Sequence, residues 1–238
     1  MARMTPLTVM DCGRAAYGPT LDLQKKLLRE VQSAADDRAY LLLVEHDPAV
    51  ITLGRRAKAE HLLASRERLA EMGIELAEAT RGGDITYHGP GQLVGYPILR
   101  LRPGQRPVHA YIRNLEEALI RLLARFGIEG RRIRGKTGVW VGEEKVAAIG
   151  VAVSRWTAYH GFALNVATDL SAFDLIVPCG IRGARVTSLE QLLGRAVAIE
   201  EVKVPLVECL AETLGLGPVQ REMGVPQATQ LTGFGANL

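Results

Sequence analysis

The stretch from Arg81 to Gln92 combines a permissive backbone with side chains that can bind a ligand or move a proton. Its sequence, RGGDITYHGPGQ, places four glycines among Arg, Asp, Thr, Tyr and His. Glycines let a backbone approach a ligand closely and point its N–H groups at it. The spacing is neither a Walker A loop nor a dinucleotide fingerprint, so it does not signal a phosphate site. An ordinary turn between strands is the alternative, and the Arg, Tyr and His favour a functional site.

Cys179 is the candidate nucleophile among three cysteines. It lies between Pro178 and Gly180, which interrupt regular structure and leave little bulk beside the sulfur. A buried, inert thiol is the alternative for any single cysteine. Cys209 lies in a helical pattern and fits that alternative, while Cys12 gives no functional signal.

Three residues are candidates for proton transfer. Lys145 opens the apolar run KVAAIGV, where a desolvated amine could act as a base, although a solvated strand end is the ordinary role of such a lysine. His88 and His160 are the other candidates, because imidazole titrates near neutral pH. On chemistry alone a Cys/His pair is preferred to a Cys/Lys pair. No histidine or cysteine spacing is typical of a metal site, so we expect no bound metal.

Apolar periodicity predicts the elements that must position these residues. Three segments have apolar residues at helical spacing: Thr20–Asp36, Val108–Phe126 and Val202–Leu214. Short apolar runs predict two buried strands joined by a turn, at Ala39–Glu45 and Ala49–Leu53, followed later by consecutive antiparallel strands between Val139 and Val166. Thr187 to Glu190 has the spacing of a capping box. The mixture predicts the α/β (α+β) class.

Length and composition indicate one folded domain. The 238 residues are 47% hydrophobic and 23% charged, enough to bury a core, and we expect a single catalytic domain over 1–238 with its core at about 7–222 and a loose tail at 224–238. The net charge of +3 is too small to imply nucleic acid. Three widely spaced cysteines favour a reducing compartment, the cytoplasm. No apolar run is long enough to span a membrane.

Four motifs together resemble the lipoyl(octanoyl) transferases. They are RGGDITYHGPGQ at 81–92, KVAAIGV at 145–151, HGFALN at 160–165 and PCGI at 178–181. Their order and separations also fit, and the resemblance extends from about Leu41 to Leu192. In the family pattern, Cys179 and Lys145 match the catalytic pair. The segments before Leu41 and after Leu214 match no motif of the family.

The resemblance implies a biotin/lipoate protein ligase-like catalytic domain, with a mixed sheet flanked by helices. It implies transfer of an octanoyl group from acyl carrier protein to a lysine of a lipoyl domain, the first step of lipoate assembly. The implied acceptors are the lipoyl domains of 2-oxoacid dehydrogenase complexes and the glycine cleavage H protein. A thioester donor is already activated, so no cofactor is expected. The residues that the family pattern assigns to the acyl site are Arg81, Gly82, Gly83, Asp84, Ile85, Thr86, Tyr87, His88, Ala147, Ala148, Ile149, His160, Gly161 and Phe162.

Two other functions stay open. An ATP-dependent lipoate or biotin ligase of the same fold would form an acyl-adenylate and would not need a nucleophilic cysteine, so Cys179 argues against it. A non-catalytic module that binds acyl or lipoyl groups would need neither Cys179 nor Lys145.

An uneven charge distribution suggests a docking surface. The segment from Arg121 to Lys136 holds six basic residues against the single acid Glu129, and a second basic group comprises Arg100, Arg102, Arg106 and Arg113. A solvated surface is the ordinary role of such runs. Aromatic residues do not alternate with these arginines, which argues against nucleic acid. We therefore predict that one or both groups, Arg131 and Arg132 in particular, attract an acidic carrier protein.

Overall fold

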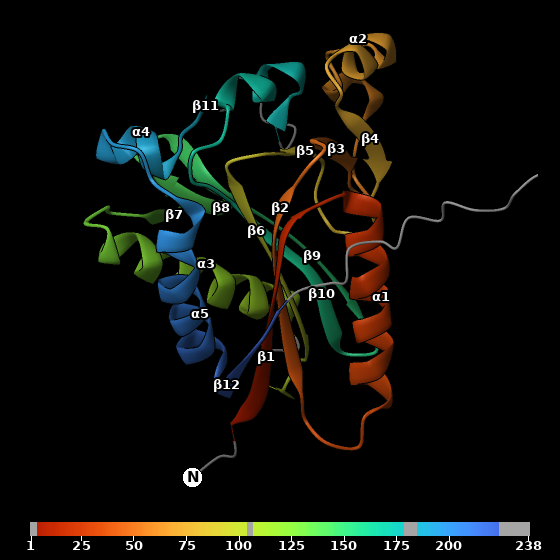
Figure 1. The fold of residues 1–238 in the computed structure, drawn as a ribbon, viewed down its shortest axis with the longest axis vertical. Coiled ribbons are helices and arrows are strands. Elements are labelled where there is room, and N and C mark those ends of the chain that lie inside the picture. The colour runs from red at the N-terminus through yellow and green to blue at the C-terminus, as the bar shows by residue number, and fades with distance from the viewer. Residues whose placement is uncertain (1–3, 104–106, 179–184, 224–238) are drawn as a thin grey trace, which may run out of the picture.

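A mixed sheet of nine strands forms the centre of the computed structural model, which describes residues 4–103, 107–178 and 185–223 (Figure 1). At one edge β1 (Thr5–Ala15) pairs in parallel with both β12 (Leu216–Met223) and β2 (Ala39–His46). Antiparallel pairing then continues through the strands β6 (Gln92–Arg100), β10 (Thr157–Asn165), β9 (Glu144–Ser154), β8 (Lys136–Val141) and β7 (Arg131–Ile133). The two-residue strand β11 (Arg185–Val186) pairs in parallel with β9.

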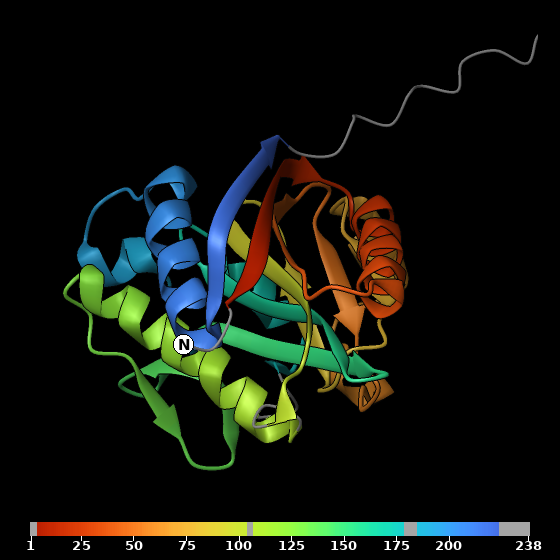
Figure 2. The same ribbon diagram turned by 90° about the horizontal axis from the view of Figure 1, so that it is seen from below.

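Helices cover both faces of this sheet, as Figure 2 shows. The helix α1 (Tyr17–Ser33) packs against β6 and β10, and α3 (Val108–Arg125) and α5 (Ile199–Leu214) pack against each other on the opposite face. The helix α3 buries Leu115, Leu119 and Leu122 completely, at the spacing that places residues on one side of a helix. The large sheet therefore has an apolar layer on each side.

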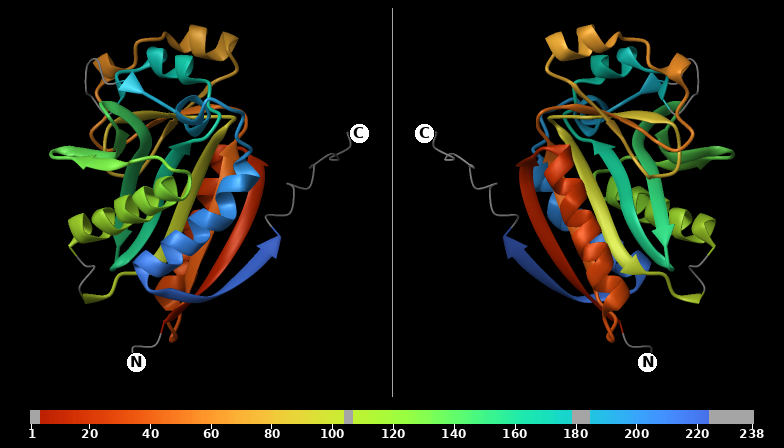
Figure 3. Two further views of the ribbon diagram at one scale, coloured as in Figure 1. Left: turned by 90° about the vertical axis from the view of Figure 1, so that its left-hand side faces the viewer. Right: turned by 90° about the vertical axis from the view of Figure 1, so that its right-hand side faces the viewer.

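A second sheet lies at one end of the first, beside the helix α2 (Arg66–Glu71) (Figures 1 and 3). Its strand order is β4 (Glu75–Glu78), β3 (Val50–Leu53) and β5 (Ile85–His88). The short 3-10 helix η3 (Leu170–Leu175) contributes Phe173 to the apolar cluster of this small sheet, and α4 (Leu189–Leu193) follows β11. Another 3-10 turn, η1, spans Ala59–His61.

The predicted fold class is confirmed, and several element predictions need correction. The predicted strands Ala39–Glu45 and Ala49–Leu53 exist, but they belong to different sheets. The capping residue before α4 is Ser188, which accepts from Gln191 N, and not Thr187. The predicted loose tail, 224–238, lies outside the described residues, and a single catalytic domain over 1–238 stays a prediction. None of the described helices is long and apolar enough to span a membrane.

Most of the arginines predicted to dock a partner are bound to acids of this chain. The carboxylate of Glu116, a residue of α3 that is only 1% exposed, accepts from Arg113 at 2.7 Å, from Arg132 at 3.2 Å and from the Gly138 N–H at 3.1 Å. Further ion pairs join Arg121 and Arg132 to Glu117, Arg125 to Glu208, and Arg131 to Glu143. These arginines stabilise the packing of α3, α5 and the β7–β9 strands. Arg106 lies outside the described residues.

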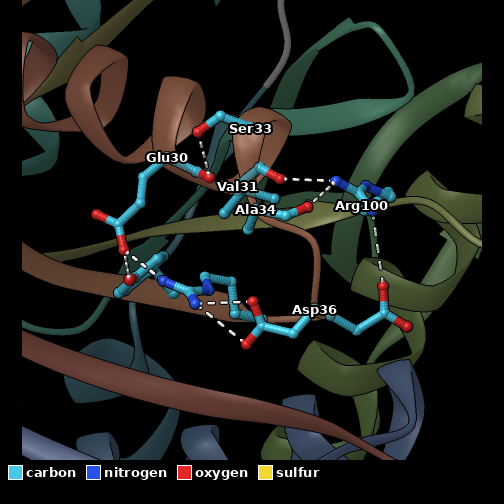
Figure 4. A network of polar contacts seen from close by, with 9 residues as sticks. Glu30, Val31, Ser33, Ala34, Asp36 and Arg100 are labelled. Atoms are coloured by element: carbon cyan, nitrogen blue, oxygen red, sulfur yellow. Dashed lines mark hydrogen bonds and ion pairs between the residues drawn. The ribbon is translucent and has the colours of Figure 1, made fainter.

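Arg100, a member of the second basic group, lies at the end of β6, and its side chain binds the C-terminal end of the helix α1. Its guanidinium donates to the backbone oxygens of Val31 at 2.9 Å and Ala34 at 3.1 Å (Figure 4). The last carbonyls of a helix have no partner within the helix, so this contact satisfies them. Arg100 therefore has a structural role, which is to bind the end of α1 to β6.

The Glu116 cluster generates a stability prediction. Replacing Arg132 by Ala removes one of two guanidinium donors from a buried carboxylate, so the free energy of unfolding should fall by about 1–3 kcal/mol. Urea unfolding at pH 7.5 measures this loss. Arg134→Ala is the matched control, because Arg134 is exposed and has no acid partner in the described part of the chain; it should change stability by less than about 0.5 kcal/mol. Equal losses of stability in the two variants would show that the contact between Arg132 and Glu116 does not contribute more to the free energy of unfolding than an exposed arginine does.

Candidate active site

A cavity of about 740 Å³ lies against β9 and β10 of the large sheet. Loop 81–84, between the small sheet's strands β4 and β5, forms part of its wall. The wall also holds a set of apolar side chains from the large sheet: Val94, Ile149, Val151, Phe162 and Ala163. The cavity thus joins segments from both sheets into one site with an apolar lining.

The structure brings twelve of the fourteen predicted acyl-site residues to this cavity. They are Arg81, Gly82, Gly83, Asp84, Ile85, Thr86, His88, Ala148, Ile149, His160, Gly161 and Phe162. Tyr87 does not line it, and its ring packs against that of Phe173, 5.6 Å away between ring centroids. Ala147 also does not line it and packs in the core of the large sheet. Whether the twelve bind an acyl chain stays a prediction.

The buried guanidinium of Arg81 holds loop 81–84 in place. Its Nη2 donates to the backbone oxygen and to Oγ1 of Thr52, both at 2.8 Å, and its Nη1 donates to the oxygen of Gly82 at 3.2 Å. The Gly82 N–H donates to Val151 O on β9 at 2.8 Å. Because Thr52 belongs to β3, this loop connects the small sheet to the large one.

Two glycines on paired strands leave space for this arrangement. Gly150 of β9 and Gly161 of β10 lie opposite each other. A Cβ on Gly150 would be 3.0 Å from both Arg81 Cδ and Gly82 O, and a Cβ on Gly161 would be 2.1 Å from Gly95 O. Any other residue at position 161 would collide with backbone, so the close approach requires glycine there.

Two buried histidines near the cavity have their tautomers fixed by hydrogen bonds. Nδ1 of His46 donates to Ala15 O at 3.0 Å, so its Nε2 accepts from the Tyr96 hydroxyl at 2.7 Å. The Gln92 amide nitrogen donates elsewhere, to Tyr87 O and Asn165 Oδ1, so its Oε1 accepts from Nδ1 of His88 at 2.8 Å. The Nε2 of His88 therefore carries a lone pair when the ring is neutral.

Burial keeps these imidazoles, and that of His160, uncharged near neutral pH. Desolvation lowers the pKa of His46 to about 4. Desolvation, with the nearby Arg81 charge, lowers the pKa of His160 to about 3. The pKa of His88 also lies well below its usual value, through burial first and then through His46 and Arg81. Such rings are weak bases at pH 7, and the choice among Lys145, His88 and His160 for proton transfer stays a prediction.

Lys145 stands buried in the cavity wall at the start of β9. Only 5% of the residue is exposed, and its Nζ lies 4.8 Å from the ring centroid of Trp140, a cation–π distance. Its backbone pairs with Val186 of β11, and its carbonyl accepts from Thr187 N at 3.0 Å. The structure therefore confirms a buried rather than a solvated lysine.

Cys179, the predicted nucleophile, lies outside the described residues. The chain before it is described up to Pro178, with the Val177 N–H bound to His61 O at 2.8 Å, and the chain after it from Arg185. The next residue, Val186, lies opposite Lys145. The strand β11, which follows residues 179–184 in the chain, thus runs beside Lys145.

The other two cysteines lie away from the cavity. Cys209 on α5 is 1% exposed, and burial raises the pKa of its thiol, as expected for an inert cysteine. Cys12 is a half-buried residue of β1. Within the described ranges no group of three or more His, Cys, Asp or Glu residues could hold a metal ion.

Several lining residues were not predicted from the sequence. Tyr17, at the start of α1, has a buried hydroxyl with no hydrogen-bond partner among the residues that the structure describes, and Tyr96 lies on β6. Arg55 and Arg56 come from the loop after β3. None belongs to a motif, and local sequence offers no signal for any of them, since only the tertiary fold brings them to the cavity.

The chain belongs to the family of lipoyl protein ligase A/B catalytic domains, which it matches over residues 16–211. Among its relatives, an octanoyltransferase of Solibacter usitatus is 55% identical over 192 residues, covering 80% of this chain and 84% of the relative. An octanoyltransferase of Chloroflexus aurantiacus is 47% identical, covering 90% of this chain and 97% of the relative. The relatives of this chain at such identity are thus octanoyltransferases.

Solved structures confirm the fold. A putative lipoate protein ligase of Thermoplasma acidophilum with bound lipoic acid superposes with a TM-score of 0.74 at 20% identity, covering 94% of this chain and 90% of that one. A lipoate-protein ligase A bound with ATP gives a TM-score of 0.73, also at 20% identity, covering 95% and 90%. At this identity the likeness concerns the fold alone.

The buried histidines generate a pH prediction. In the unfolded chain each imidazole binds a proton below about pH 6.5, whereas folded His160 binds one only near pH 3, so the unfolded state gains protons as the pH falls. This linkage should cost about 2 kcal/mol of stability per histidine between pH 7.5 and pH 5. His160→Asn should remove one such contribution, because Asn tolerates the left-handed backbone at this position, where φ is 56°.

Urea unfolding of both proteins at the two pH values measures the difference. The stability lost on acidification should be smaller in the variant by about 2 kcal/mol. An identical loss in both would exclude His160 as a source of acid sensitivity.

Proposed function

We propose that this chain transfers an octanoyl group from the thioester of acyl carrier protein to a lysine of a lipoyl domain, through a thioester on Cys179. The observation that carries the proposal is an apolar-walled cavity with a buried lysine, Lys145, in its wall. The family and the octanoyltransferase relatives support the same activity.

The cavity suits an aliphatic chain. Each methylene moved from water into an apolar wall contributes about 0.8 kcal/mol, and Ala148, Ile149, Val151 and Phe162 provide such a wall. The neutral imidazoles add no charge that an alkyl chain would have to desolvate. A volume of about 740 Å³ accommodates the acyl group with part of the thiol arm that carries it.

The proposed reaction has two halves. In the first, the Cys179 thiolate attacks the donor carbonyl, a C–S bond forms to Cys179, the C–S bond to the carrier breaks, and Lys145 protonates the leaving thiolate. In the second, the acceptor lysine amine attacks the acyl-enzyme, an amide forms, and the Cys179 thiolate leaves while Lys145 takes the amine proton. The acyl group starts as a thioester, which is already activated for attack by a thiolate or an amine, so no ATP is required.

The proposed acceptors are the lipoyl domains of 2-oxoacid dehydrogenase complexes and the glycine cleavage H protein. The proposed compartment is the cytoplasm, where three widely spaced cysteines would stay reduced.

Removing the proposed nucleophile tests whether the reaction passes through an acyl-enzyme, as a ping-pong mechanism requires. Wild-type protein mixed with octanoyl-acyl carrier protein, without ATP, should gain one octanoyl mass that maps to Cys179. Cys179→Ala should neither gain this mass nor turn over, because no thiolate remains to attack. Cys209→Ser is the control and should keep most of its activity. Near-normal turnover of Cys179→Ala, or a requirement for ATP, would exclude this mechanism and favour a ligase.

The role of Lys145 is tested separately. An adjacent ammonium stabilises a thiolate, so Lys145→Ala should raise the pKa of the Cys179 thiol and slow turnover by about 10²–10⁴-fold. The rate of alkylation by iodoacetamide as a function of pH measures the thiol directly. Lys145→Arg keeps the charge and should retain much of the low thiol pKa without the proton transfer. An unchanged alkylation profile in Lys145→Ala would remove Lys145 from this role.

A further inference from the structure

The opening of the cavity carries basic side chains from two separate segments. Arg55, Arg56 and Lys58 lie in the loop after β3, and Lys136 begins β8; all four line the cavity. Arg55, Arg56 and Lys58 are exposed and Lys136 is half-buried, whereas interior lining residues such as Phe162 are buried. The four cations therefore mark the side of the cavity that faces solvent. We call them the rim cations.

Very little acid offsets the rim cations. Asp84 is the one carboxylate among the described residues that line the cavity, and it is engaged by His61 Nδ1 at 2.7 Å. No carboxylate of the described chain lies within ion-pair distance of Arg55 or Arg56. Within the described segments, the only acid at ion-pair distance from Lys58 is Glu60 at 3.9 Å, and both of those side chains are about two-thirds exposed. The charge of Arg55 also lowers the pKa of His160, so its field reaches the interior.

This pattern contrasts with the arginines that the sequence singled out. Arg113, Arg121, Arg125, Arg131 and Arg132 all have acid partners within the chain. Reversing the charge of Arg132 would place a carboxylate against Glu116 and Glu117 and would disturb the fold before it affected a partner. Unlike these five arginines, Arg55 and Arg56 form no ion pair in the described part of the chain, and they lie beside the cavity.

We propose that Arg55, Arg56, Lys58 and Lys136 form the docking surface for the acidic carrier protein that delivers the acyl thioester. The proposal rests on the proposed function. A thioester carbonyl has to enter the cavity to reach Lys145, while the folded body of its carrier has to remain outside. The carrier must therefore contact whatever surrounds the opening. A rim with several cations and almost no free acid complements an acidic surface and repels a basic one.

Charge reversal at the rim tests the proposal. Arg55→Glu combined with Arg56→Glu should lower kcat/KM for acyl-enzyme formation from octanoyl-acyl carrier protein by about tenfold in 50 mM salt. The loss should shrink to less than about threefold in 1 M salt, where screening limits electrostatic attraction to a few ångströms. An octanoyl ester of a small neutral thiol has no charged body to attract, so its kcat/KM should fall clearly less than that of the carrier-bound donor. Quenched samples analysed by intact mass give both rates.

The control carries the same change of charge elsewhere. Arg29→Glu combined with Arg66→Glu alters two exposed arginines, on α1 and α2, that lack acid partners in the described chain and do not line the cavity. In this control variant, kcat/KM for acyl-enzyme formation should equal the wild-type value with both donors. The thermal midpoint of each variant shows that it is folded.

Each of the following results would contradict the proposed docking surface. Equal losses with both donors would show a disturbed active site, and no loss with either would leave the rim cations as ordinary solvated surface. A defect confined to the second half-reaction, measured from preformed acyl-enzyme, would assign the rim to the acceptor domain. If wild-type protein forms no acyl-enzyme from either donor, the proposed function itself is wrong, and this outcome is distinct from the other three.

Discussion

The cavity depends on one buried side chain, the guanidinium of Arg81. It binds Thr52 of the small sheet, and the adjacent Gly82 N–H binds Val151 of the large sheet, so one loop joins both sheets. Burying a guanidinium is costly unless oxygen atoms satisfy it, and the backbone supplies them here. The same charge lowers the pKa values of His88 and His160. Arg81 thus holds the loop that shapes the site, and it adds to the burial that keeps His88 and His160 uncharged.

Helices and strands with a clear local pattern were predicted correctly from the sequence. Strands whose position depends on pairing with a distant segment were not. The helix α3 and the strands β8 to β10 have clear periodicity and short turns, and they were predicted correctly. The strand β12 was missed because LGPVQREM is polar and contains a proline; its pairing with β1, at the other end of the chain, holds it in the sheet. β2 and β3 are separated by three residues yet enter different sheets, and no local pattern encodes that choice.

The candidate site was predicted through its motifs, and its surroundings were not. Glycines and polar groups of the motifs lie together on the cavity wall, so Lys145 and twelve of the fourteen residues predicted for the acyl site line it. The net charge of a segment does not show its ion pairs: Glu116, a buried carboxylate one turn from Arg113 along α3, also binds Arg132, so docking by these arginines stays a prediction. Arg55 and Arg56 were not predicted as site residues, because two adjacent arginines are common in sequences. Only the tertiary structure places them at the opening of the cavity.

The position of Lys145 has a consequence for the order of encounters. The lysine is buried in the wall of a single cavity, so on the proposed route the thiol carrier and the lysine-bearing acceptor must approach it through the same opening. On that route the two proteins would exclude each other. A carrier that has delivered its acyl group still occupies the opening until it dissociates, and during that time it acts as a competitive inhibitor of the second half-reaction. Tight binding of the donor would accordingly slow turnover, so moderate affinity with rapid exchange is the regime in which such an enzyme works fastest.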